Sequence, residues 1–198
     1  MEIYFNSKSK DYYQLSNFYG GVECEFMKDR FLDKEIKSLF DKFETCNKDE
    51  FIYYLKELQP EKKDWTQAKI NYWCKDGKPI RGILSKLAGA SVKDTPTGRR
   101  RLKILKKMAN FEGEVRIKAI LTLEEKKELM LKCLKKKFLS YDENKYVENK
   151  YNKLLLSTGE LILHEKPMRG KGDDWTYPGG DLLGKLLMNI RKKLISKF

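Results

Sequence analysis

A glutamate and an arginine near the N-terminus have the spacing of two side chains on one helical face. Glu23 and Arg30 are seven residues apart, nearly two turns of an α-helix. A carboxylate there can protonate a leaving base or activate water, and cleavage of a glycosidic bond through an oxocarbenium-like state needs such a group. Glu23 and its neighbour Glu25 can equally be solvated carboxylates at a helix start, since charged residues are mostly exposed. Glu23 is therefore a candidate catalytic acid, with Glu25 as its rival.

Two aromatic residues and an asparagine have side chains suited to binding a nucleotide. Trp175 follows Asp173 and Asp174 in a glycine-rich segment typical of a loop, and Phe18 follows Asn17 in a second turn-rich segment. Stacking of a base on an aromatic ring contributes roughly 1–3 kcal/mol, and the Asn17 amide could reach a ribose or a phosphate. Core packing of the two rings, and an Asx turn at Asn17, are the structural alternatives.

The chain carries a large positive charge. Its 198 residues include 42 Lys+Arg against 29 Asp+Glu, a formal net charge of +13. Such a surface attracts nucleic acid, nucleotides and phosphates, although a lysine-rich composition is by itself a non-specific signal. Residues 99–107 hold the densest run of basic side chains. They cannot all share one face of a helix, but they could follow a nucleic-acid backbone.

Cysteines and hydropathy narrow the class of protein further. The four cysteines form no CxxC pair and the chain has one histidine, which disfavours a structural zinc site and makes a disulfide framework unnecessary at this size. No apolar run is long enough to predict a membrane-spanning helix, and the first residues lack the pattern of a secretory signal. We therefore expect a cytoplasmic protein with no membrane partner.

The elements that must position these residues are predicted to be mainly helical, with minor short strands. Residues 2–5 suggest a strand, and helices are expected within 22–43, over 49–59 with Asp49 as cap, and from Thr122 to about 138. Further helices are expected over residues 62–72, 80–90, 99–108 after a break at 95–98, and from Asp181 onward. Residues 140–153 read as a loop or a short helix, and residues 154–180 as irregular with short strands.

Segments from both ends of the chain resemble one known family. Ile3-Tyr4-Phe5 is followed by Leu15-Ser16-Asn17-Phe18, and residues 154–159 (LLLSTG) are followed by Glu165, Trp175 and the LGKLLMNIR stretch that ends at Arg191. Residues 82–89 are more loosely similar to the family's AK-x-LG stretch. On these segments the chain resembles the NADAR superfamily, also called YbiA-like, whose name joins NAD and ADP-ribose.

This resemblance implies a fold and an activity. The fold would be a compact multihelical YbiA-like domain over residues 1–198, with residues 32–75 as a helical insertion. The activity would be hydrolysis of an N-glycosidic bond, either in a ribosyl-phosphate intermediate of the riboflavin pathway or in ADP-ribose attached to guanine in nucleic acid. It implies no metal and no other cofactor. Expected partners are the ADP-ribose-containing or ribosyl-phosphate substrate and, with it, nucleic acid.

The resemblance also implies roles for single residues. Glu23 matches the family's catalytic glutamate, but Arg30 stands where the family has a lysine thought to attack the opened sugar. Because a guanidinium stays protonated, Arg30 could only clamp an anion, and the amine's role would pass to Lys86. Asp173 or Asp174 would be the second carboxylate, although the family aspartate falls at Gly172 here. The substrate-binding residues implied are Asn17, Phe18, Arg30, Glu165, Trp175 and Arg191.

These and other departures from the family pattern leave alternatives open. Lys86 can be a solvent-facing helix lysine, and Glu165 can pair with a lysine. Asp181 replaces a family asparagine, and both residues cap helices well. Thr122 replaces a family tryptophan and so removes one stacking side. The chain could instead be a non-catalytic module that binds ADP-ribose or NAD, or a basic nucleic-acid-binding protein.

Overall fold

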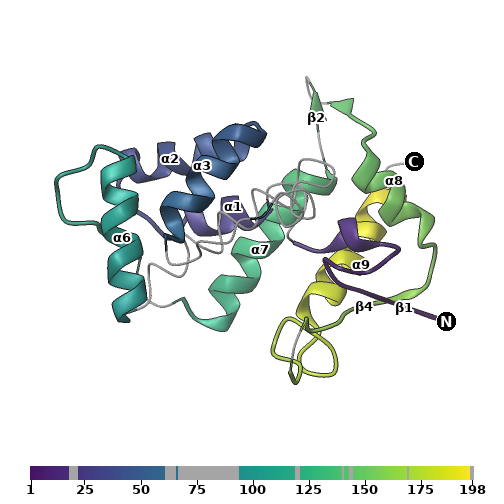
Figure 1. Cartoon of the computed structure of the whole chain (residues 1–198). Helices are drawn as coiled ribbons and strands as arrows, with labels where there is room; N and C mark the ends of the chain where they lie inside the picture. Colours follow the sequence, from purple (N-terminus) through teal and green to yellow (C-terminus); the bar gives the residue numbers. More distant parts are fainter. Residues whose placement is uncertain are drawn as a thin grey trace. The chain divides into compact units, whose positions relative to one another are not determined.

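The chain is mainly helical, as predicted. The computed structural model describes residues 1–17, 22–60, 66, 94–118, 121–139, 141–142, 145–168 and 170–196 (Figure 1). Within these residues it has seven α-helices and four short strands. None of the helices in the described part of the chain is long and apolar enough to cross a bilayer.

The chain divides into two compact units. Unit 1 consists of Met1–Val22 and Thr122–Phe198, and unit 2 of Glu23–Leu121. That the whole chain forms one YbiA-like domain, with residues 32–75 inserted in it, stays a prediction.

Unit 2 is a helical cluster built around phenylalanines. Its helices are α1 (Val22–Lys28), which begins at the unit boundary, α2 (Lys34–Thr45), α3 (Lys48–Leu58) and α6 (Pro96–Met108). Phe31, Phe40, Phe43 and Phe51 are buried together, and Leu105 joins them from α6. Apolar residues at helical spacing thus bury one face of each helix in a common core.

Two helices of unit 2 begin earlier than predicted. The cap of α3 is Asn47 and not Asp49, because Asn47 Oδ1 accepts hydrogen bonds from the backbone N–H groups of Asp49 at 2.9 Å and Glu50 at 3.0 Å. Helix α6 starts within the segment predicted to be a break. Thr95 caps it, and Pro96 in its first turn already has the helical φ.

Unit 1 contains a two-stranded parallel sheet. Strand β1 (Glu2–Phe5) pairs with β4 (Ile162–Glu165), with Phe5 opposite Glu165, so the carboxyl ends of both strands lie at one edge. Helix α9 (Leu182–Ile195) packs on β4. A Cβ added at Gly184 would lie 2.0 Å from the Leu163 carbonyl oxygen, so this approach requires a glycine.

Short elements and two helices complete unit 1. They are the 3-10 helix η1 (Tyr13–Leu15), α7 (Leu123–Phe138), the antiparallel pair β2 (Tyr141–Asp142) and β3 (Lys145–Tyr146), and α8 (Lys150–Ser157). The capping box predicted for α7 is confirmed: Thr122 Oγ1 accepts from the Glu125 N–H, and the Thr122 N–H donates to Glu125 Oε2. Helices α7, α8 and α9 pack against one another.

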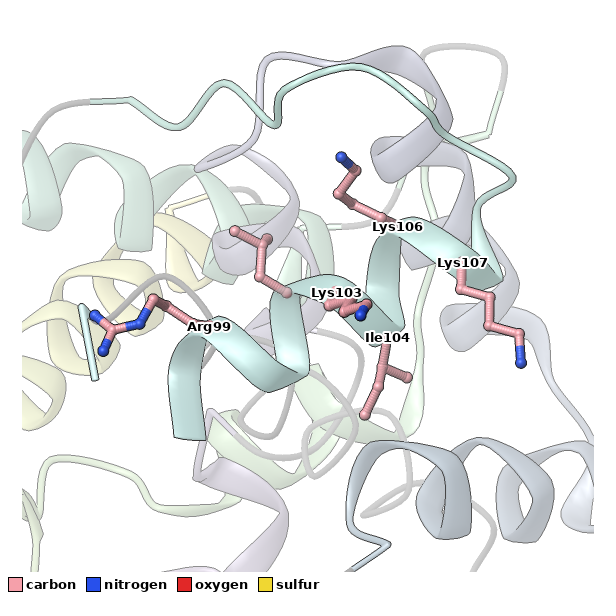
Figure 2. A pocket seen from close by; sticks show the side chains of 6 residues that line it. Arg99, Lys103, Ile104, Lys106 and Lys107 are labelled. Carbon is pink, nitrogen blue, oxygen red and sulfur yellow. The ribbon is translucent and has the colours of Figure 1, made fainter. Parts of the chain in front are cut away.

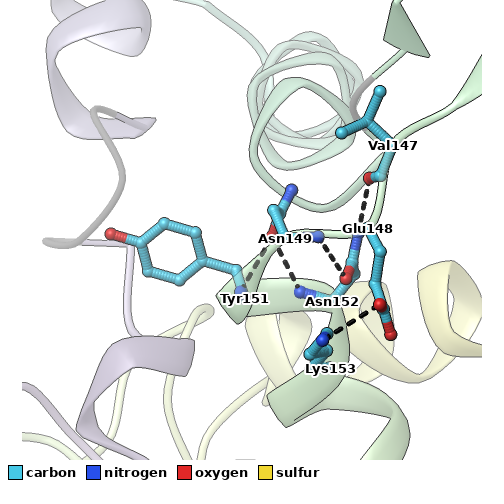
Figure 3. Close-up of polar contacts among 6 residues, drawn as sticks. All are labelled: Val147, Glu148, Asn149, Tyr151, Asn152 and Lys153. Atoms are coloured by element: carbon cyan, nitrogen blue, oxygen red, sulfur yellow. Dashed lines mark hydrogen bonds and ion pairs between the residues drawn. The ribbon is translucent and has the colours of Figure 1, made fainter.

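Helix α8 occupies part of the segment that the sequence predicts to be irregular. Asn149 Oδ1 accepts hydrogen bonds from the N–H groups of Tyr151 at 2.8 Å and Asn152 at 3.0 Å, and Asn152 Oδ1 accepts from the Asn149 N–H (Figure 3). Two asparagines thus form a reciprocal cap that starts the helix. Asn149 Nδ2 also donates to the Lys137 carbonyl at 3.2 Å, which ties α8 to the end of α7.

Candidate functional site

A buried hydrogen bond joins two distant segments of unit 1 at the carboxyl edge of the β1/β4 pair. Glu165, the last residue of β4, is buried, and its Oε1 accepts a 2.9 Å hydrogen bond from the Ser16 hydroxyl. Ser16 directly follows η1 and has no exposed surface. The contact therefore brings the turn after η1 to the end of β4, although the two residues are 149 positions apart.

An amine from α7 lies at the same place. Lys137 Nζ donates to the backbone carbonyl oxygens of Gln14 at 2.6 Å and Ser16 at 2.9 Å. The residue is only 4% exposed, and its Nζ lies 4.9 Å from the centroids of the Phe138 and Tyr151 rings. We call Ser16, Lys137 and Glu165 the β-edge cluster.

Burial changes the acid–base behaviour of this amine. Desolvation lowers the pKa of Lys137 well below the usual lysine value, and the charge of Glu165 opposes part of that effect. An amine with a lowered pKa is neutral more often, which makes it available as a nucleophile or a base. The β-edge cluster thus combines a carboxylate, a hydroxyl and an amine of lowered pKa, and it fixes the turn that carries Asn17.

Asn17, a predicted substrate ligand, borders the β-edge cluster. Its Oδ1 lies 3.5 Å from the Ser16 hydroxyl, whereas the hydrogen bond from Ser16 to Glu165 is 2.9 Å long, so the hydroxyl is directed mainly at the carboxylate. Asn17 is half-buried. The Asn17 amide therefore lies between the buried β-edge cluster and the protein surface.

The loop that carries Asp173 and Trp175 returns to Glu165. The Tyr177 N–H donates to the Glu165 carbonyl at 2.8 Å. Two N–H groups at the start of α9 donate to the carbonyl oxygens of Asp174 at 3.0 Å and Trp175 at 3.3 Å. The structure therefore brings the predicted residues Asp173 and Trp175 to the same end of β4 as Glu165.

The carboxylate of Asp173 shapes this loop. Its Oδ1 accepts hydrogen bonds from the N–H groups of Trp175 and Thr176, both at 3.0 Å, and from the Thr176 hydroxyl at 2.8 Å. The Asp173 side chain is exposed, while Trp175 is half-buried. Asp173 therefore acts as a turn-forming residue in this structure, and its catalytic role stays a prediction.

Arg191 lies at the opposite end of β4. Its Nη1 donates a 2.7 Å hydrogen bond to the hydroxyl of Thr158, and both residues are buried. Thr158 precedes β4 in the chain, whereas Glu165 ends that strand. The structure thus does not bring Arg191 to the β-edge cluster; it anchors α9 to the turn after α8. Contact of Arg191 with a substrate phosphate stays a prediction.

The remaining predicted residues are described only in part. Phe18 and Lys86 lie outside the described residues, and only the backbone of Glu23, within α1, is described. Arg30 follows α1, and its Nε is buried without a hydrogen-bond partner among the residues that the structure describes. A donor left in that state could serve the anion clamp predicted for Arg30. The roles of all four residues stay predictions.

A second polar group surrounds the histidine. His164 Nδ1 lies 2.7 Å from Asp181 Oδ2, and the Tyr4 ring stacks on the imidazole at a centroid distance of 5.0 Å. A hydrogen bond to Glu2 raises the pKa of Tyr4 to about 12. Asp181 holds the N-cap position of the last helix, as predicted, with a φ of 52°, but its side chain contacts His164 and makes no capping bond.

Lys137 is not among the residues predicted from the sequence, although the sequence contains a signal for it. Lys137 follows Met130 by seven residues and Leu134 by three, so it lies on the buried face of α7. A lysine on an apolar stripe indicates a buried amine. For Ser16 and His164 no local pattern predicts the partner, because each contact joins elements far apart in the chain.

No metal site is found in the described part of the chain, where no group of three or more His, Cys, Asp or Glu side chains could hold an ion. Comparisons with protein-family models, with curated proteins and with solved structures each found no match. Function is therefore inferred from this chain's own residues and from the segments that resemble the NADAR superfamily.

Proposed function

We propose that this protein hydrolyses an N-glycosidic bond in a ribose-phosphate-bearing substrate. The substrate would be ADP-ribose attached to guanine in nucleic acid, or a ribosyl-phosphate intermediate of the riboflavin pathway. One observation carries the proposal: the hydrogen bond between Ser16 and Glu165 joins the two segments on which the resemblance to the NADAR superfamily rests. The two segments must lie close together if their substrate-binding residues line one pocket.

In the proposed reaction the bond between the ribose anomeric carbon and the base nitrogen breaks. The electron pair leaves with the nitrogen, which takes a proton from Glu23, and a water oxygen bonds to the anomeric carbon. The water's proton passes to a carboxylate, for which Asp173 is the candidate through Oδ2, since Oδ1 is engaged within the loop. Asn17 and Trp175 would hold the ribose and the base.

The β-edge cluster would position Asn17. Lys137 holds the carbonyl oxygen of Ser16, and Glu165 holds the Ser16 hydroxyl, so the residue before Asn17 is fixed on two sides. A substrate ligand fixed in this way loses little entropy on binding, which is how positioning accelerates a reaction.

The test is release of free ADP-ribose from DNA carrying ADP-ribose on guanine, followed by chromatography. We expect product with the wild-type protein and a rate lower by about 10²-fold or more with Glu23→Gln, a usual effect of losing a general acid. Glu25→Gln is the matched control, because it removes the rival carboxylate on the same helix. If the wild-type protein leaves both this DNA and the riboflavin intermediates intact, the proposed hydrolysis is excluded.

A non-catalytic module that binds ADP-ribose or NAD is the second candidate. A Cβ at Gly172, where the family has its aspartate, would lie 2.7 Å from the backbone nitrogen of Gly179, so this loop cannot accept a side chain there. Thr122 serves as a helix cap where the family has a tryptophan. Calorimetric binding of ADP-ribose that is unchanged by Glu23→Gln, with no product formed, would favour this candidate.

A further inference from the structure

A groove lined by lysines lies along α7 and the end of α9, within unit 1. Lys132, Lys135 and Lys136 contribute from α7 and Lys193 from α9, with Leu131 and Leu139 among them. The groove holds about 730 Å³. We call it the lysine groove.

The charge of the lysine groove exceeds what its helices need. Cations in the last turns of α7 and α9 stabilise the negative ends of the helix dipoles, which amount to about half a charge each. Glu128, which also lines the groove, adds one negative charge. The two helix ends together present about one negative charge, which is less than the charge of Lys135 and Lys193 alone.

Two of these ammonium groups are available to a ligand. Lys135 and Lys193 are exposed and come from different helices. Their ammonium groups have no hydrogen-bond or ion-pair partner among the residues that the structure describes. They differ in this respect from cations that are already held by a neighbouring acceptor.

A second basic groove, along α6, offers a comparison (Figure 2). There the Arg99 guanidinium pairs with Asp94, and Lys106 Nζ donates to the Glu112 carbonyl oxygen at 3.3 Å. Part of its charge is therefore engaged within the protein. The exposed Lys103 and Lys107 of α6 provide matched positions for a control.

We propose that the lysine groove binds the phosphate backbone of a single-stranded nucleic acid. Cations on both helices can contact successive phosphates, while Leu131 and Leu139 provide apolar surface for the sugars and bases. A single phosphate would fill little of a groove of about 730 Å³, whereas a strand can follow it. Recognition would be largely independent of sequence, because the contacts of the lysines with phosphates carry no sequence information.

Helix α7 links this groove to the β-edge cluster. The buried side chain of Lys137 belongs to that cluster, while Lys135 and Lys136 of the same turn are exposed. A strand bound in the groove is therefore held at a fixed position relative to Glu165 within unit 1. Binding in the groove does not depend on hydrolysis, so the two proposals can fail separately.

The experiment measures binding of an unmodified single-stranded oligonucleotide of about twelve nucleotides, a length within the usual site size, by fluorescence anisotropy over a range of salt concentrations. The double variant Lys135→Gln/Lys193→Gln removes one cation from each helix. We expect weaker binding and a slope of log K against log salt that is shallower by about 1.4, since each lost contact to a single strand contributes about 0.7. Lys103→Gln/Lys107→Gln removes the same charge from the basic run of α6 and shows how much of the change follows from net charge alone; we expect a smaller loss of affinity and a smaller change in slope.

Two results would overturn the proposal. The first is an unchanged affinity and salt slope in the Lys135→Gln/Lys193→Gln variant, with circular dichroism showing wild-type helix content. The second is displacement of the oligonucleotide by an equal concentration of polyglutamate, which would indicate an acidic protein partner. A wild-type protein that binds the oligonucleotide but hydrolyses none of the proposed substrates would contradict the proposed function and leave the proposal for the lysine groove intact.

Discussion

Replacing Lys137 by methionine tests whether the buried amine and the Glu165 carboxylate stabilise each other. The change keeps an unbranched side chain but leaves the carbonyl oxygens of Gln14 and Ser16 without their donor. Each buried group that loses its hydrogen-bond partner costs about 1–3 kcal/mol, and Glu165 loses the electrostatic attraction of the amine. Removing the desolvated ammonium group offsets part of this. We expect a net loss of about 3 kcal/mol in the free energy of unfolding.

A double-mutant cycle isolates the interaction between the two residues. Glu165→Gln removes the charge but keeps an oxygen that can accept from the Ser16 hydroxyl. The double variant Lys137→Met/Glu165→Gln leaves no unpaired charge, so it should be more stable than the sum of the single losses by about 1–3 kcal/mol. Urea unfolding at one pH and ionic strength, followed by circular dichroism, measures all four proteins.

The control lies two residues away on the same helix. Lys135 is exposed, so Lys135→Met should change the free energy of unfolding by no more than about 0.5 kcal/mol. Losses that add within about 0.5 kcal/mol in the cycle would show that Lys137 and Glu165 do not interact. A Lys137→Met variant as stable as Lys135→Met would refute the buried position of the amine.

Three further predictions concern pH, packing and capping. Because burial lowers the pKa of Lys137, the unfolded chain binds more protons between that lowered pKa and about 10.4, so the free energy of unfolding should rise with pH across this window. Lys137→Met should flatten that rise in urea titrations at a series of pH values, and an equal slope in both proteins would contradict the assignment. Gly184→Ala should cost about 1–3 kcal/mol, since its Cβ would meet the Leu163 carbonyl oxygen, and a thermal melt like that of the wild type would argue against this close packing. Thr122→Ala should cost about 1 kcal/mol through loss of the capping box with Glu125, whereas Thr122→Ser should cost much less, as compared by urea unfolding.

Features that depend on neighbouring residues could be read from the sequence. The apolar spacing of α2, α7 and α9 predicts helices, and the box formed by Thr122 and Glu125 fixes where α7 begins. Errors arose where several residues could cap one helix. Asn47 and Asp49 are both good caps, and the structure uses the one whose side chain reaches two free N–H groups.

The candidate site could be predicted only in outline. The resemblance of both chain ends indicates that Asn17 and Glu165 serve one place, and within unit 1 the turn before Asn17 does contact Glu165 through Ser16. Arg191 belongs to the same resembling segment but binds Thr158 instead. The position of Arg191 along α9 does not reveal which end of β4 its long side chain will contact.

The sequence alone determined that this protein is mainly helical and strongly basic, because composition and helical periodicity are local properties. The tertiary structure alone decided that Lys137 is buried against the turn before Asn17 and that Asp181 contacts His164 instead of capping its helix. The first contact joins α7 to the turn after η1, and the second joins the start of α9 to β4, so both depend on how elements far apart in the chain pack, which no local pattern encodes.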